Sequence, residues 1–272
     1  MTTQAATTRA ERGWELAARC GYVVSGLLHG LIGLLALRLA LGDESKEADQ
    51  SGALQTVAQT PFGAVVLWFA VVAFAALGAW QAAIALRGRA GASSGLAERS
   101  AGDRAKAAGK AVVYLALAVT SYAFATGGGK SSDQQTTDTT TRLMQAPGGR
   151  LLVGAIGVAV VVVGVYHVVK GLRQRFLRDL RSLPAGRVGT AVRWSGMVGY
   201  VSKGIALGIV GVLFVLAAWH ANPQEAGGID TALRTLQRQP AGDLLLALVA
   251  VGLIAFGVYS FVRALREGVR GR

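Results

Sequence analysis

Long apolar stretches alternate with shorter polar segments along this chain. Six stretches cover Gly21–Leu41, Phe62–Leu86, Ala108–Thr126, Leu151–Val169, Val198–Trp219 and Leu244–Val262. A helix needs about 20 apolar residues to cross the hydrocarbon core of a bilayer. The pattern therefore predicts an all-α polytopic membrane protein with six transmembrane helices, although the third stretch is short.

The second helix of each successive pair carries the same four landmarks at the same spacing. A proline is followed by a glycine 2 residues later, a second glycine after 17 residues and an aromatic residue after 19. The three sets are Pro61, Gly63, Gly78 and Trp80; Pro147, Gly149, Gly164 and Tyr166; and Pro240, Gly242, Gly257 and Tyr259. A fixed spacing of this kind indicates an internal repeat.

We interpret these landmarks as structural. Proline suits the first turn of a returning helix, because that residue needs no N–H donor there. The glycines permit close packing. The aromatic residue, roughly 28 Å further along the helix, would reach the opposite membrane interface.

The first helices also correspond, with Gly26 and Gly30 repeated as Gly204 and Gly208 at an offset of 178 residues. These GxxxG pairs favour packing within the bundle over a dimerisation face. Each unit crosses the membrane and returns, so we expect three parallel two-helix repeats in a pseudo-threefold arrangement. The repeats span residues 19–89, 104–176 and 193–268, between an N-terminal segment at 1–18 and a tail at 269–272.

Basic residues are concentrated on one side of the predicted spans. Of the 28 Lys and Arg residues, 20 lie in the terminal segments and the connections between repeats, and 6 lie in the alternate loops. The positive-inside rule therefore predicts a multi-pass protein of the plasma membrane with cytoplasmic termini. The net charge of +13 does not indicate nucleic-acid binding, because the charges flank apolar spans. The basic connections instead predict juxtamembrane linkers that attract anionic lipids or simply set the topology.

Three polar residues within the spans are candidates for function: Ser25, His29 and Lys203. His29 lies near the predicted midplane, where polar groups mark functional sites, but packing against a neighbouring helix also explains a neutral imidazole. Lys203 can extend back along its helix to the interface. Gln81, His167 and Ser260 share one repeat position beyond the aromatic landmark and could surround a cytoplasmic vestibule.

The sequence shows no metal-ligand spacing and no nucleophile with a base, and we expect no cofactor. A haem held by two histidines is disfavoured, because His29 and His167 should differ in depth by about 10 Å.

The Gly-Tyr and GxxxG motifs, followed by Pro-x-Gly and Gly-x-Trp/Tyr, resemble the domain of unknown function 1206 family over residues 19 to 268. This family comprises membrane proteins found mainly in actinobacteria. The resemblance implies a six-helix plasma-membrane protein and carries no established activity or site residues. The missing catalytic constellation and the Gly-rich, interface-like spans favour a non-catalytic scaffold or accessory subunit, which could bind a membrane-protein partner. The alternatives are a passive transporter or small channel along the pseudo-threefold axis and a haem-binding redox subunit.

Overall fold

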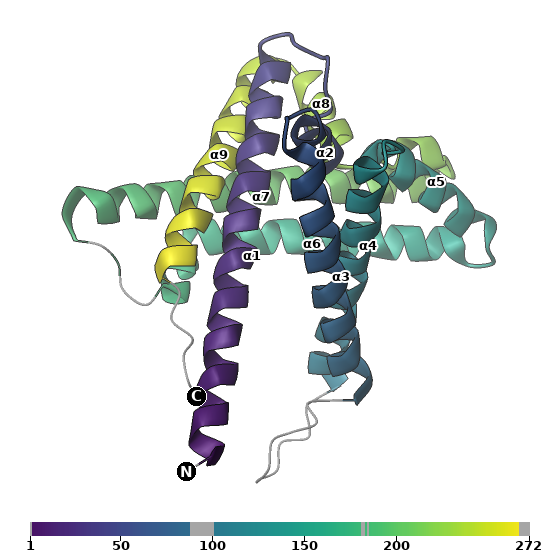
Figure 1. Cartoon of the computed structure of the whole chain (residues 1–272). Helices are drawn as coiled ribbons and strands as arrows, with labels where there is room; N and C mark the ends of the chain where they lie inside the picture. Colours follow the sequence, from purple (N-terminus) through teal and green to yellow (C-terminus); the bar gives the residue numbers. More distant parts are fainter. Residues whose placement is uncertain (1, 88–100, 181–182, 184, 267–272) are drawn as a thin grey trace. The chain divides into compact units, whose positions relative to one another are not determined.

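The computed structural model describes residues 2–87, 101–180, 183 and 185–266, and all regular structure in these ranges is helical. Its elements are α1 (Thr2–Ala40), α2 (Gln50–Ala58), α3 (Gly63–Arg87), α4 (Ala101–Ala125), α5 (Ser132–Gln145), α6 (Gly149–Leu172), η1 (Arg175–Asp179), α7 (Gly186–His220), η2 (Pro223–Glu225), α8 (Ile229–Gln237) and α9 (Gly242–Arg266) (Figure 1). Six helices, α1, α3, α4, α6, α7 and α9, contain a segment long and apolar enough to cross a membrane. The predicted all-α class with six membrane-crossing helices is confirmed.

Two helices begin well before their apolar stretches. α1 starts at Thr2 and α7 at Gly186, whereas the apolar pattern begins at Gly21 and Val198. Hydropathy marks the part of a helix that can lie in hydrocarbon, but backbone hydrogen bonding continues beyond it. The basic connection over 170–193, predicted as a juxtamembrane linker, contains η1 and the start of α7. The middle of the other predicted linker, at 88–100, lies outside the described residues.

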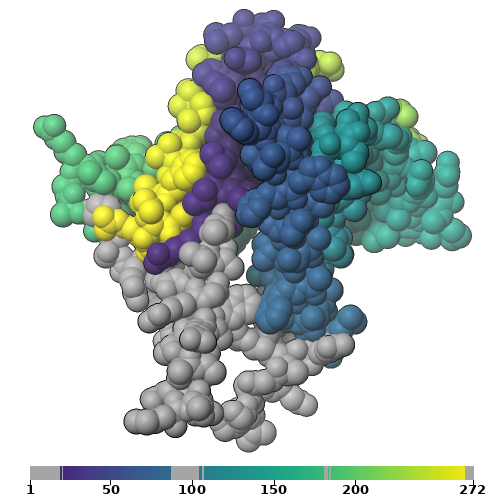
Figure 2. All heavy atoms as spheres, viewed as in Figure 1, coloured from purple at the N-terminus to yellow at the C-terminus, as the bar shows by residue number. Residues whose placement is uncertain are grey.

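The chain divides into two compact units, which are described separately. Unit 1 comprises residues 1–53 and 132–272, and unit 2 comprises residues 54–131. In unit 1, α9 packs along α1 and α6 along α7, while in unit 2 α3 packs along α4. Figure 2 shows the contact between α1, in purple, and α9, in yellow. Each of these pairs joins the second helix of one repeat to the first helix of the next, and the third repeat packs back on the first.

The α6–α7 pair depends on direct contact between glycine backbones. A Cβ atom on Gly164 would lie 2.8 Å from both the Gly204 oxygen and the Gly208 nitrogen. That separation is shorter than an ordinary van der Waals contact, so no larger residue fits without moving a helix. The second glycine landmark of this repeat therefore packs against the GxxxG pair of the next repeat.

The same interface recurs in the other two pairs. A Cβ atom on Gly257 of α9 would lie 2.7 Å from the Gly26 oxygen and 3.1 Å from the Gly30 nitrogen of α1. In unit 2, Gly78 of α3 instead meets the side chain of Leu115 on α4. The register is conserved among the three pairs, but the middle repeat replaces a backbone contact by a side-chain contact.

In Figure 1 the α6–α7 pair crosses the α1–α9 pair instead of lying alongside it. α6 has 24 residues and α9 has 25, so each is roughly 37 Å long. A helix of that length spans a hydrocarbon core of about 30 Å when tilted by about 35°. Two pairs tilted in opposite directions can therefore cross steeply and both still span the bilayer.

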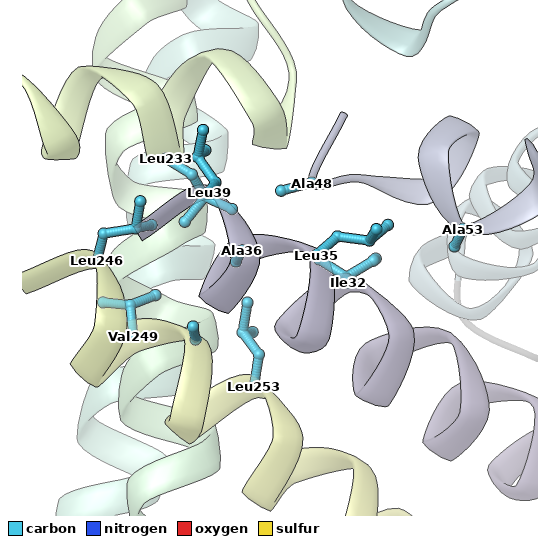
Figure 3. Close-up of a cluster of buried hydrophobic side chains, with 11 residues drawn as sticks. Ile32, Leu35, Ala36, Leu39, Ala48, Ala53, Leu233, Leu246, Val249 and Leu253 are labelled. Atoms are coloured by element: carbon cyan, nitrogen blue, oxygen red, sulfur yellow. The ribbon is translucent and has the colours of Figure 1, made fainter. Parts of the chain in front are cut away.

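The main apolar core of unit 1 lies between α1, α8 and α9. In Figure 3, Leu246, Val249 and Leu253 of α9 line the side of α1 that carries Ala36 and Leu39. Leu233 of α8 lies beside Leu39 and is fully buried. Burial of these side chains stabilises the α1–α9 pair at the end away from the chain termini.

Polar contacts connect the loops of different repeats within unit 1. The Asp230 carboxylate accepts a hydrogen bond from the Ala48 N–H at 2.7 Å and pairs with Arg234 at 2.7 Å. The Ser132 N–H donates to the Ser51 hydroxyl at 3.0 Å. The loop of the first repeat is thus tied to the loops of both other repeats.

Asp133 caps a helix of another repeat. α8 begins after Gly228, which has no side chain to cap it. Asp133 accepts hydrogen bonds from the Gly228 N–H at 2.6 Å, the Thr231 N–H at 3.1 Å and the Thr231 hydroxyl at 2.6 Å. Its carboxylate therefore replaces the usual N-cap side chain at the positive end of the α8 dipole.

The first glycine landmark forms the joint between each short helix and the span that follows it. A Cβ atom on Gly63, Gly149 or Gly242 would overlap a backbone carbonyl near the end of α2, α5 or α8. The Pro-x-Gly sequence therefore permits a tight turn into α3, α6 and α9.

Candidate functional site

α7 crosses α9 where small residues let the two backbones approach. A Cβ atom on Gly199 would lie 2.6 Å from the Phe256 Cα, and one on Gly252 would overlap the Ser202 side chain. This crossing brings the α7 residues next to Gly199 and Ser202 against Phe256. The site described below is built around it.

Four aromatic rings pack together at the crossing. The Tyr200 ring centroid lies 5.4 Å from that of Phe176, 5.1 Å from that of Phe256 and 5.7 Å from that of Tyr259. All four side chains are buried. The Tyr259 hydroxyl donates a hydrogen bond to the Phe176 carbonyl at 3.0 Å, which attaches η1 to α9.

A charged group lies beside these rings. The Asp179 carboxylate pairs with Lys170 at 2.8 Å and with Arg263 at 3.2 Å. Arg263 also donates to the Tyr200 hydroxyl at 3.4 Å, and the Lys170 ammonium lies 4.9 Å from the centre of the Tyr200 ring. One carboxylate thus balances two cations contributed by α6 and α9.

His29 and Lys203 meet on Phe256, although they come from different repeats. The His29 ring centroid lies 4.7 Å from that of Phe256, and the Lys203 ammonium lies 4.6 Å from the same ring. His29 Nδ1 is 2.8 Å from the Ser25 carbonyl. Because a carbonyl oxygen only accepts hydrogen bonds, Nδ1 carries the proton of the neutral ring, and Nε2 is left unprotonated. Lys203 makes no hydrogen bond or ion pair with any residue that the structure describes.

His167 belongs to the same site. Its Nδ1 donates to the Val163 carbonyl at 2.8 Å, and its ring stacks on Tyr200 with centroids 5.9 Å apart. Lys203 interacts electrostatically with both His29 and His167, which also interact with each other. Sequence spacing alone did not place residues of α1, α6 and α7 in one cluster.

The repeat partners of His167 differ from it. Ser260 is buried and donates to the Phe256 carbonyl within its own helix at 2.8 Å, whereas Gln81 lies on α3 in unit 2.

The aromatic landmark residues of the three repeats differ in exposure. Trp80 and Tyr166 are 47% and 55% exposed, as expected at an interface, but Tyr259 is 1% exposed. The interfacial interpretation is therefore wrong for Tyr259, because η1 covers its ring.

Most polar groups of the site already have partners. No group of three His, Cys, Asp or Glu residues that could hold a metal occurs in the described ranges. The Asp179 carboxylate is already paired, and each histidine Nδ1 is engaged by a backbone carbonyl. The ammonium of Lys203 is the group of the site that still lacks a polar partner among the described residues.

Sequence reasoning missed Asp179, Arg263 and Phe256. Asp179 carried one signal, since it is the sole acidic residue of the basic segment 170–193. Arg263 and Phe256 had none, because a basic residue ending a span and a phenylalanine within it are both ordinary. Their contribution depends on the α7–α9 crossing.

The repeated spans and their copied interfaces define a polytopic helical membrane protein made of three related repeats. The chain belongs to the family described as Domain of Unknown Function (DUF1206), which matches residues 20–88, 105–174 and 198–267. It is similar to the uncharacterized protein YxxB of Bacillus subtilis (strain 168), with 28% identity over 250 residues that cover 92% of this chain and 90% of the relative. No solved structure matches the chain significantly.

Proposed function

We propose that this protein is a non-catalytic integral protein of the plasma membrane that acts by binding, as a scaffold or accessory subunit. One observation carries the proposal: His29 and Lys203, which occur in single repeats, converge on Phe256 at a site whose carboxylate is already neutralised. A site of this kind can hold a partner or ligand.

The orientation is part of the proposal. The excess of Lys and Arg at the termini and between the repeats supports cytoplasmic termini. A reporter active only in the cytoplasm, fused after residue 272, should be active in cells. If the fusion at this end is inactive and a fusion in the loop before α8 is active, the protein has the opposite orientation.

Co-purification tests the scaffold role. The full-length protein, extracted from its native membrane in mild detergent, should recover the same membrane protein at a constant ratio in independent preparations. Substitution of Lys203 or His29 should lower the amount of partner recovered more than substitution of the exposed Lys110, which lies in unit 2. Recovery of the chain alone from every preparation would refute the scaffold role.

A passive transporter is the second candidate, and the basic side chains within the spans favour it. Purified protein in liposomes would then conduct small anions, and Lys203→Gln would reduce the flux. Flux equal to that of protein-free liposomes rejects this candidate. A haem-binding role would require a coloured protein from haem-replete cells.

A further inference from the structure

Lys203 is a positively charged residue within a membrane span, and the described residues do not neutralise its charge. Its ammonium rests on the Phe256 ring, and no carboxylate pairs with it in the described ranges. Phe256 lies seven residues before Arg263 on α9, which places the ring about 10 Å along the helix from that basic residue. A charge inside a membrane span is costly unless it finds a partner, and it marks a functional site by default.

Among the residues that the structure describes, the groups facing Lys203 do not supply the missing negative charge. α1 contributes His29 and α6 contributes His167 and Lys170, each of which can only be neutral or positive. Asp179 is the carboxylate of this cluster of contacts, and it is shared by Lys170 and Arg263. The cluster therefore carries an excess of positive charge.

The basic side chains of the cluster are less buried than the rings beside them. Lys203, His29 and His167 are only partly buried, in contrast to the four aromatic rings beside them. Each imidazole has its Nδ1–H engaged by a backbone carbonyl, so its unprotonated Nε2 is an acceptor and donates to an anion only once it is protonated. An ammonium that has no carboxylate partner in the described ranges, set beside aromatic rings, suits an anionic group that accepts its hydrogen bonds.

We propose that this cluster binds the phosphate head group of an anionic lipid, with Lys203 as the main contact. A lipid phosphate already resides at the membrane interface, and its apolar chains can remain among the helices. Basic sites between transmembrane helices recognise acidic head groups in this way. The inference rests on the proposed binding role of this site and names its ligand. Lipid retention and partner recovery are measured separately, so either can fail without the other.

Native mass spectrometry of the full-length protein provides the test. Protein released from bilayers of phosphatidylglycerol and phosphatidylcholine in equal amounts should retain phosphatidylglycerol preferentially. Lys203→Gln should weaken retention about tenfold or more, which is the usual effect of losing a charge-assisted hydrogen bond. Lys203→Arg should keep most of it. Lys110→Gln removes the same charge from an exposed position in unit 2 and should leave retention unchanged.

Several outcomes would overturn the proposal. Equal retention of the two lipids by the wild-type protein would do so without reference to any variant, so the test does not depend on how the variants fold. Equal loss in Lys203→Gln and Lys110→Gln would show non-specific attraction only. Inorganic phosphate added to protein in phosphatidylcholine should not raise the unfolding midpoint. If it does so as strongly as phosphatidylglycerol, the ligand is a soluble anion and the lipid assignment is wrong.

Discussion

Replacing Gly164 by alanine tests the interface that is copied through the protein. The new Cβ atom would lie 2.8 Å from the Gly204 oxygen, 2.8 Å from the Gly208 nitrogen and 3.0 Å from the Gly208 Cα. All three atoms belong to backbone, so no side chain can rotate away. α6 and α7 must separate locally, and overpacking of this kind costs about 1–3 kcal/mol.

Gly208→Ala is a matched control in the same helix pair. A Cβ atom on Gly208 meets nothing within 4 Å. Both substitutions gain up to about 1 kcal/mol of helix propensity, so this gain cancels when the two variants are compared. The difference between their unfolding free energies should therefore be about 1–3 kcal/mol, with Gly164→Ala less stable.

Unfolding in mild detergent micelles, titrated with a denaturing detergent and followed by circular dichroism, measures this difference. Gly257→Ala and Gly30→Ala should repeat it in the α9–α1 pair, because a Cβ atom on Gly257 meets backbone and one on Gly30 meets nothing. If Gly164→Ala and Gly208→Ala have equal stability within error, the inferred glycine contact is wrong. A change of oligomeric state in Gly208→Ala would instead show that the GxxxG pair serves dimerisation.

Three further predictions concern carboxylates. Asp133→Ala should cost about 1–2 kcal/mol, as for an N-cap, and should speed hydrogen exchange at the start of α8. Asp179→Asn should cost about 1–3 kcal/mol in the same unfolding titration, since two partly exposed cations lose their partner, whereas the exposed Asp43→Asn should cost much less. Burial raises the pKa of Asp49 above 3.8, so the wild-type stability should fall as pH rises from 3.8 through the raised value. Asp49→Asn should remove that fall in stability. A variant that keeps the wild-type pH profile would show that Asp49 does not cause the fall.

The helix pairs give the landmark residues a more specific role than matching the thickness of the membrane. The second glycine of each repeat, such as Gly257, meets the first helix of the next repeat, and the last repeat closes on the first. In the middle repeat the partner positions are Tyr114 and Ala118 instead of glycines, and Gly78 packs on a leucine side chain. The copy that diverged most in sequence is therefore the one that changed its helix contact.

The polar residues show how far sequence reasoning can go with a membrane protein. His29 and Lys203 were identified because polar groups are rare and costly in apolar spans. Their meeting on Phe256 was not predictable, because they belong to different repeats and lie 174 positions apart. Tyr259 was misjudged for a related reason: its position matches Trp80 and Tyr166, but η1 covers it alone.

By itself the sequence determined the membrane environment, the number of membrane-crossing helices and the repeat. These properties depend on local quantities, namely apolar length, charge placement and spacing, which are written along the chain. Only the tertiary structure decided which helices pair and which single residues share a site. Those outcomes depend on where two backbones can approach closely, as at Gly199 and Gly252, and a contact between distant helices leaves no periodic trace in either of them.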